Sequence, residues 1–234
     1  MKIFSLLLTA VLASNAVSQK PVSRPASKLP SVVPAASAVP VAKTDENGQV
    51  SGRIYTNTVY GFRITFPDAW LIPGRDFEDH MKSQGFDISL KAPVNVGRAG
   101  QLQVARSLEK VKILVTGYRA LPGSKDNALM RVAVEDLSMT PQVKDAVDYF
   151  DLMRSQFAVM KLPADFKFSE TQAEKLGAKQ FAFLDTSSNA GRKRMYAAVR
   201  RGHAILFTLS YSKPEDLAAM RQILAGGDFT LQNK

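Results

Sequence analysis

The sequence predicts an α+β fold with a central antiparallel sheet covered by helices. Three observations lead to this prediction: short stretches in which apolar and polar residues alternate, two capped stretches with helical periodicity, and turn residues between neighbouring strands. Strands followed by a helix, and then strands followed by a second helix, are typical of a sheet packed against helices. The two helices argue against a pure β-barrel.

The folded part is expected to open with two short strands, residues 54–57 and 62–66, joined by a turn at Tyr60-Gly61. The second strand lies within VYGFRITFPDAW, residues 59–70. Side chains alternate along it as in a strand with one buried face. Pro67 is expected to end this strand. The side chains expected in the core are Phe62, Ile64, Phe66 and Trp70.

A short strand at 88–90 and a hairpin with a long loop are expected next. The hairpin strands alternate around Val111–Val115 and Met130–Val134, and Pro122-Gly123 and Asp126-Asn127 supply the turn residues between them. We therefore expect these two strands to pair antiparallel.

The period then changes to that of a helix of about twenty residues. Thr140 is expected to cap it, with Pro141 at the first helical position. Its stripe of methionine and phenylalanine could line a ligand site, but apolar residues at this spacing usually face a core. The residues of the stripe are Val143, Val147, Phe150, Met153, Phe157 and Met160.

Three strands in quick succession follow, at 180–186, 194–201 and 203–211. Gly202 alone separates the last two, which predicts a tight hairpin. Ser212-Lys-Pro-Glu215 then resembles a capping box with a proline inside it. It predicts a final helix that ends at Gly226-Gly227, after which Phe229 returns to the core.

Both ends of this domain resemble the PsbP-like family, over about residues 53–231. The resemblance implies an α/β/α sandwich with a central antiparallel sheet, and it implies no chemistry. Its members include an extrinsic photosystem II subunit, a nuclear-import factor and many secreted bacterial proteins, so no functional residue is carried over. The residues that carry it are Tyr60, Gly61, Phe62, Ile64, Phe66, Pro67 and Trp70, then Pro214, Glu215, Leu217, Ile223, Leu224 and Phe229.

The first residues predict export from the cytoplasm. MKIFSLLLTAVLASNAVSQK has the basic start, apolar run and small residues of a signal peptide, residues 1–18, with cleavage expected near Ala16 or Ser18. Its apolar run is too short for a membrane anchor. Residues 19–52 are rich in Pro, Ser and Ala and predict a disordered linker, either a spacer or a passive leader. The globular domain is then expected at 53–234.

The chain contains no cysteine, which excludes disulfides, a thiol nucleophile and a lipid-modified cysteine. Its formal net charge is +10, and removal of Lys2 with the signal peptide would leave +9. From Arg53 onward, 26 basic residues face 19 acidic ones. This surplus favours acidic partners such as anionic lipid, cell-wall polymer or nucleic acid. Secretion makes nucleic acid the least favoured of these.

No motif of a known catalytic or cofactor site occurs in the sequence. A weak divalent-metal candidate is formed by Asp76, Asp79 and His80, although a solvated charged loop explains these residues equally well. His203, next to basic residues beside the tight turn, is expected to have a lowered pKa and not to act as a base. We expect no cofactor.

Basic residues are concentrated at the two ends of one predicted strand. Arg192, Lys193 and Arg194 lie at one end and Arg200 and Arg201 at the other, about 20 Å apart along the strand. Each spot is either a contact for an acidic partner or a charged edge that prevents aggregation.

The function hypothesis is a non-enzymatic secreted or periplasmic domain that binds a protein or envelope component. The alternatives are an envelope hydrolase with scattered site residues and a carrier of small molecules or metal. A pocket with converging carboxylates would favour an enzyme, whereas a flat surface would favour a binding domain.

Overall fold

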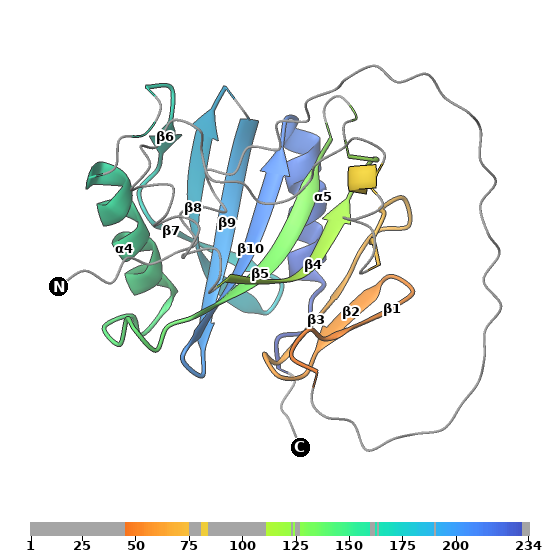
Figure 1. Cartoon of the computed structure of the whole chain (residues 1–234), viewed down its shortest axis with the longest axis horizontal. Helices are drawn as coiled ribbons and strands as arrows, with labels where there is room; N and C mark the ends of the chain where they lie inside the picture. The colour runs from red at the N-terminus through yellow and green to blue at the C-terminus, as the bar shows by residue number, and fades with distance from the viewer. Residues whose placement is uncertain are drawn as a thin grey trace.

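The computed structural model describes residues 45–74, 81–83, 111–122, 124, 127–159, 162, 164–189 and 191–230. Within these residues, ten strands and two helices of more than one turn are arranged around two antiparallel sheets (Figure 1). The strand expected at 88–90 lies outside the described residues.

The larger sheet has seven strands, in the order β4-β5-β10-β9-β8, and both β6 and β7 pair with the free edge of β8. All of these pairs are antiparallel, and the two predicted hairpins, β4 with β5 and β9 with β10, are among them. The strands are β4 (Val111–Tyr118), β5 (Leu129–Asp136), β6 (Lys167–Phe168), β7 (Gln172–Leu176), β8 (Lys179–Ser188), β9 (Gly191–Arg200) and β10 (His203–Tyr211).

The smaller sheet consists of β1 (Gln49–Ser51), β2 (Ile54–Asn57) and β3 (Phe62–Thr65), in that order. β1 begins before Arg53, within the stretch expected to be a linker. The predicted turn before β3 is confirmed: Gly61 has φ 73° and donates its N–H to the carbonyl of Asn57 at 2.9 Å.

Helix α4 (Ala146–Val159) is shorter than expected and begins later. Asp145 caps it, because its Oδ1 accepts hydrogen bonds from the N–H groups of Val147 at 2.8 Å and Asp148 at 2.9 Å. Thr140, the expected cap, instead donates its hydroxyl to the carbonyl of Leu137. The prediction of a helix capped by Thr140 was therefore wrong.

Helix α5 (Pro214–Ala225) begins with proline in the first turn, as predicted, but without a capping box. Its N-cap is Lys213, whose backbone is extended and whose side chain makes no capping hydrogen bond. Asp216, in the first helical turn, is buried and pairs with Arg119 at 3.0 Å. This ion pair fixes the start of α5 near the end of β4.

Two apolar clusters lie on opposite faces of the larger sheet. On one face, side chains of β5, β8, β9 and β10 pack with the small sheet and α5. On the other face, α4 packs over β8 and β9. The aromatic centre of the first cluster is formed by Phe62, Phe181, Phe207 and Phe229. Phe207 and Phe229 contact each other and both of the other rings, with centroids 5.1–6.3 Å apart.

The predicted fold class, a central sheet covered by helices, was wrong. Strands dominate the described residues, and a second antiparallel sheet covers much of the face for which helices were expected. Each helix packs on only a few strands, α4 on β8 and β9 and α5 mainly on β10, β7 and β3. The strands of the small sheet are too short for their pattern to reveal a separate layer.

Among the residues that the structure describes, no helix has the length and apolar character needed to cross a membrane.

Candidate functional site

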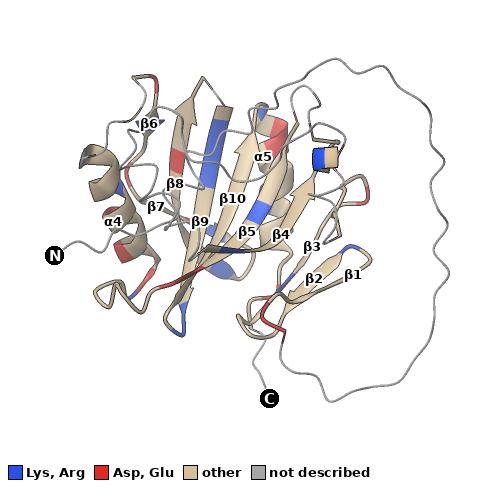
Figure 2. Cartoon of the chain, viewed as in Figure 1, with Lys and Arg blue, Asp and Glu red and all other residues tan. Residues whose placement is uncertain are grey.

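The two predicted basic spots lie at opposite ends of β9. The first spot, Arg192 to Arg194, is divided between the two faces of the sheet, because neighbouring residues on a strand point to opposite faces. Lys193 aligns with Thr186 of β8 and Ser210 of β10 on the α4 side of the sheet. Arg192 and Arg194 therefore point to the other face, and Arg192 is exposed. Figure 2 marks the basic positions on β9.

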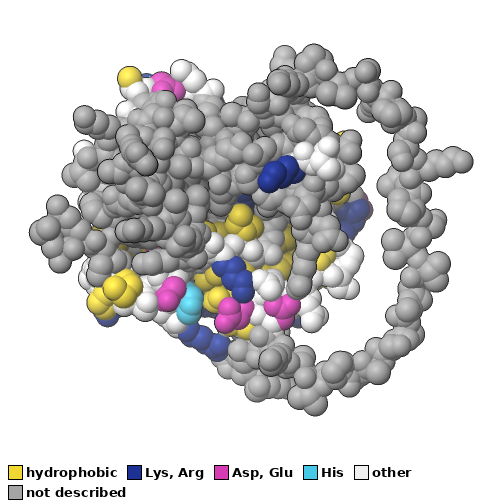
Figure 3. All heavy atoms as spheres, viewed as in Figure 1, with side chains coloured by type: hydrophobic (Ala, Val, Ile, Leu, Met, Phe, Trp, Pro, Cys, Tyr) yellow, Lys and Arg dark blue, Asp and Glu magenta, His cyan; other side chains and the backbone are white. Residues whose placement is uncertain are grey.

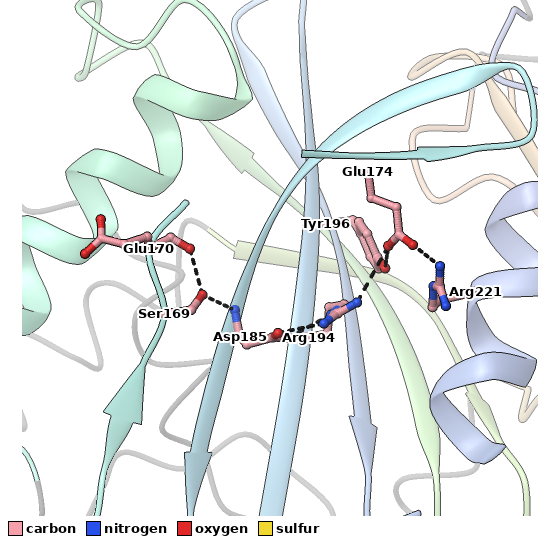
Figure 4. Close-up of polar contacts among 7 residues, drawn as sticks. All are labelled: Ser169, Glu170, Glu174, Asp185, Arg194, Tyr196 and Arg221. Carbon is pink, nitrogen blue, oxygen red and sulfur yellow. Dashed lines mark hydrogen bonds and ion pairs between the residues drawn. The ribbon is translucent and has the colours of Figure 1, made fainter. Parts of the chain in front are cut away.

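Arg194 is held in a network of polar side chains between β7, β8, β9 and α5 (Figure 4). Its Nε and Nη2 both donate to the carboxylate of Asp185 at 2.7 Å, and its guanidinium lies 4.2 Å from the ring centroid of Phe183. Glu174 accepts a hydrogen bond from Tyr196 at 2.5 Å and another from Arg221. Two arginines and two carboxylates thus balance their charges.

This network serves the fold and leaves little of Arg194 for a partner. The Arg194 side chain is only 17% exposed. Burial alone would lower its pKa, but the hydrogen bonds with Asp185 and Tyr196 raise the pKa on balance. Two carboxylates do meet here, but Arg194 contacts both of them, and the arrangement is that of an ion-pair network.

The second basic spot lies at the two-residue turn between β9 and β10. Arg201 and Gly202 have φ values of 50° and 73°, which is the backbone of a type I′ turn and confirms the predicted tight hairpin. Among the described residues, Arg201 is the one non-glycine residue with positive φ. This conformation costs about 1–2 kcal/mol for a side chain with a Cβ. The exposed Arg201 therefore occupies a position that favours glycine or asparagine.

Arg200 has a different role from its neighbour. Its Nη1 donates to the carbonyl of Gly61 at 3.0 Å, and its Nη2 donates to the carbonyl of Phe229. It thereby joins the end of β9 to the turn before β3 and to the segment after α5. Arg201 donates one longer hydrogen bond, from Nη1 to the carbonyl of Val59 at 3.2 Å, and is otherwise exposed.

An open pocket of about 450 Å³ lies where these segments meet. Tyr60 and Phe229 are largely buried at its wall, so the ring surface that remains accessible is small. The pocket combines aromatic surface, backbone of the turn before β3 and one exposed guanidinium. Its lining residues are Val59, Tyr60, Gly61, Arg200, Arg201, Phe229 and Thr230. We call this region the Arg201 pocket.

The charge around the Arg201 pocket is mixed. Burial raises the pKa of Tyr60, and the nearby carboxylates of Glu46 and Asp136 raise it further. His203 lies opposite Asp136 across the strand pair, and its ring meets that of Tyr60 edge-on at 5.5 Å. Figure 3 shows histidine, acidic and basic side chains next to one another at the lower edge of the face drawn.

His203 is oriented by its own turn. Its Nδ1 lies 2.9 Å from the carbonyl oxygen of Arg201, which can only accept, so Nδ1 carries the hydrogen of this bond. The imidazole thereby ties the strand to the turn.

The predicted metal candidates Asp76, Asp79 and His80 lie outside the described residues. In the part of the chain that is described, no three histidine, aspartate or glutamate side chains are grouped as metal ligands.

The sequence pattern identified part of the Arg201 pocket but not its composition. It marked Arg200 and Arg201 as one basic spot, whereas their side chains have different roles. It predicted Tyr60 as a turn residue and Phe229 as a core residue, and it did not predict that both line the pocket. Arginine directly before glycine in a two-residue turn was the available signal, because arginine is an unfavourable choice there.

No family model matches the chain, and no curated protein sequence matches it. It is similar to the solution structure of cyanobacterial PsbP (CyanoP) from Synechocystis sp. PCC 6803, with 13% identity, a TM-score of 0.42, and coverage of 78% of this chain and 98% of that chain. It is also similar to a crystal structure from Bacteroides thetaiotaomicron VPI-5482, with 9% identity, a TM-score of 0.36, and coverage of 77% and 49%. At these values nothing about function follows from either similarity.

Proposed function

We propose that this protein is a non-enzymatic binding domain that recognises an acidic segment of a partner protein through the Arg201 pocket. The observation that carries this proposal is the backbone of Arg201, which has positive φ at the tip of a hairpin while its side chain is exposed. Strained backbone at an exposed position is characteristic of functional sites. An exposed guanidinium can bind a carboxylate with two parallel hydrogen bonds.

The mixed charge around the pocket favours a polypeptide over a polyanion. Glu46 and Asp136 lie within electrostatic range of Tyr60, so a uniformly negative polymer or lipid surface would meet repulsion beside Arg201. A peptide can place a carboxylate on Arg201 and neutral or basic groups near the two acids. The accessible edges of Tyr60 and Phe229 supply apolar contact for such a peptide.

The place of action is part of the same proposal. The basic start, short apolar run and small residues at the beginning of the chain support export, so the partner would be a periplasmic or secreted protein. Sequencing the amino terminus of protein recovered outside the cytoplasm should give Val17 or Gln19 as the first residue. Recovery only from the cytoplasm, with Met1 retained, would contradict this location.

Fluorescence anisotropy with two matched peptides tests the binding proposal. One short labelled peptide carries glutamate, lysine and an aromatic residue, and the other has glutamine in place of each glutamate. The wild-type protein should prefer the glutamate peptide at low ionic strength. Arg201→Asn should weaken its binding roughly tenfold, because a charge-assisted hydrogen bond contributes about 1.5–3 kcal/mol.

Arg192→Asn is the matched control, since Arg192 is exposed at the opposite end of the same strand. It removes the same charge and should leave peptide binding unchanged. The free energy of unfolding of Arg201→Asn should equal that of the wild type or exceed it by up to about 1 kcal/mol, because asparagine tolerates the left-handed backbone. Equal losses in the two variants, or no preference for the glutamate peptide, would refute the proposal.

A further inference from the structure

His203 lies next to two of the residues that line the Arg201 pocket. Its ring meets the ring of Tyr60 edge-on, with centroids 5.5 Å apart, and its Nδ1 is hydrogen-bonded to the carbonyl oxygen of Arg201 at 2.9 Å. The imidazole is partly exposed, so it can exchange a proton with the solvent. Histidine is the side chain that ordinarily changes its charge between pH 5 and 8. The charge beside the pocket can therefore depend on pH.

The hydrogen bond to Arg201 determines which nitrogen of His203 takes up the proton. A carbonyl oxygen only accepts, so Nδ1 carries a hydrogen in the neutral and in the charged imidazole. Protonation therefore occurs at Nε2 and leaves this bond intact. The backbone of the turn keeps its conformation, and protonation acts on the pocket through its charge alone.

Charged groups of the larger sheet face His203 from both neighbouring strands. His203 aligns with Asp136 of β5 and with Arg200 of β9, and residues paired in this way share a face of the sheet. The carboxylate of Asp136 accepts hydrogen bonds from Ser138, and Arg200 donates to backbone carbonyls. The histidine drawn in Figure 3 accordingly lies among acidic and basic side chains.

The small sheet and the segment before it supply the other groups on this side of His203. Tyr60 faces the imidazole, and the carboxylate of Glu46, which acts on Tyr60, pairs with Lys112 at 3.2 Å. Within the described residues around His203, three positive charges thus accompany two negative ones, a sum of +1 that protonation raises to +2. These charged residues are Lys112, Arg200 and Arg201, then Glu46 and Asp136.

We propose that protonation of His203 strengthens the binding of an acidic peptide in the Arg201 pocket, so that this pocket binds more tightly in mildly acidic than in neutral solution. This inference rests on the proposed function. A positive charge beside Arg201 attracts the carboxylate that Arg201 binds, and the bound carboxylate in turn favours uptake of the proton. The gain in affinity should be about fivefold at low ionic strength, and added salt should reduce it.

Fluorescence anisotropy with the glutamate and glutamine peptides, both with blocked ends, tests this inference at about pH 7.5 and about pH 5.5. Glutamate side chains remain mostly charged at the lower value. Affinity for the glutamate peptide should rise about fivefold on acidification, and affinity for the glutamine peptide should change little. His203→Asn can still donate to the carbonyl of Arg201 but does not titrate, so it should lose the rise. Arg192→Asn, at the opposite end of β9, should retain it.

A nuclear magnetic resonance titration of the wild-type protein gives a second readout that does not depend on a variant. The chain has two histidines, and the imidazole of His203 is identified by its contact with the ring of Tyr60. The glutamate peptide should move the midpoint of its titration to higher pH, because proton and peptide must favour each other equally, and the glutamine peptide should not.

The outcomes separate this inference from the proposed function. A preference for the glutamate peptide that is equal at both pH values, or that still rises on acidification in His203→Asn, would overturn the role of His203 and leave the proposed function standing. A His203 midpoint that the glutamate peptide does not move would do the same. No preference for the glutamate peptide at either pH would refute both.

Discussion

At the scale of single residues, VYGFRITFPDAW is mainly a core element. Phe62, Ile64 and Phe66 are each 1% exposed, and Trp70 is 7% exposed beside the ring of Phe66. Period-two alternation predicted these residues correctly, because one buried face dictates it. The same pattern could not reveal that Tyr60 and Gly61 line a pocket, since the other walls come from segments far along the chain.

Trp70→Ala should lower the free energy of unfolding by about 3–5 kcal/mol, because it removes a large buried side chain and leaves a cavity. Urea unfolding followed by circular dichroism measures this change. Leu121→Ala is a suitable control, since Leu121 is 63% exposed and its loss should change stability little. A Trp70 variant with wild-type stability would show that its indole does not support the core.

Lys193 should make stability depend on alkaline pH. Its folded-state pKa of about 8 lies below the ordinary 10.5, because of burial and then of Arg131. Above pH 8 the unfolded chain therefore binds more protons than the folded one, and the free energy of unfolding rises with pH. For one group, the free energy of unfolding changes by at most about 1.4 kcal/mol per pH unit. This stabilisation is complete above the ordinary pKa of 10.5 and is lost as the pH falls through the folded-state pKa of about 8.

Chemical unfolding of the wild-type protein and Lys193→Met at several pH values between 8 and 10 measures this contribution. The variant should lack the rise, and Arg192→Met should retain it. The series stays below the pKa of Tyr60 and Tyr196, which burial raises above 10.0 and which would act in the opposite direction. Parallel curves for the wild type and Lys193→Met would contradict the assignment.

The sequence was least informative about the basic residues of β9. It grouped Arg192, Lys193 and Arg194 because they are consecutive, but a strand directs alternate side chains to opposite faces. Arg194 contacts Glu174 of β7, and Glu174 is in turn bound by Arg221 of α5. The sequence pattern does not predict which side chains from such distant segments pair with one another.

At the scale of elements, α4 begins later than the sequence pattern predicted. Thr140-Pro141 resembles the beginning of a helix, and the apolar period extends from there past Asp145. The carboxylate of Asp145 accepts from two free N–H groups, whereas the hydroxyl of Thr140 is engaged with Leu137. Tertiary packing on β8 and β9 then determines where the helix lies.

Asp145→Ala should therefore destabilise the protein by about 1 kcal/mol, because it leaves two N–H groups of the first turn without their acceptor. Thr140→Ala should have the smaller effect, although Thr140 is buried. Thermal unfolding of both variants gives the comparison. A larger loss of stability in Thr140→Ala than in Asp145→Ala would indicate that Thr140 caps the helix, as the sequence pattern predicted.

At the scale of the whole molecule, local hairpins were predictable and the layer structure was not. Antiparallel neighbours such as β9 and β10 follow from alternation and a short turn. The small sheet is placed by contacts between the beginning and end of the domain. Arg63 and Asp228 exchange backbone hydrogen bonds at 2.7 and 2.9 Å, although they lie 165 positions apart in the chain.

Arg200 connects these two segments to the larger sheet, since it donates to carbonyls of the turn before β3 and to that of Phe229. Arg200→Met should lower the free energy of unfolding by about 1–3 kcal/mol, because partly buried carbonyls lose their donors. Hydrogen exchange should accelerate at the amides of Arg63 and Asp228 before it accelerates in β10, as the small sheet separates first. Arg201→Met, one residue further along the chain, should leave exchange in the small sheet slow. Uniform acceleration over both sheets in Arg200→Met would mean that they open as a single unit and that Arg200 does not govern their contact.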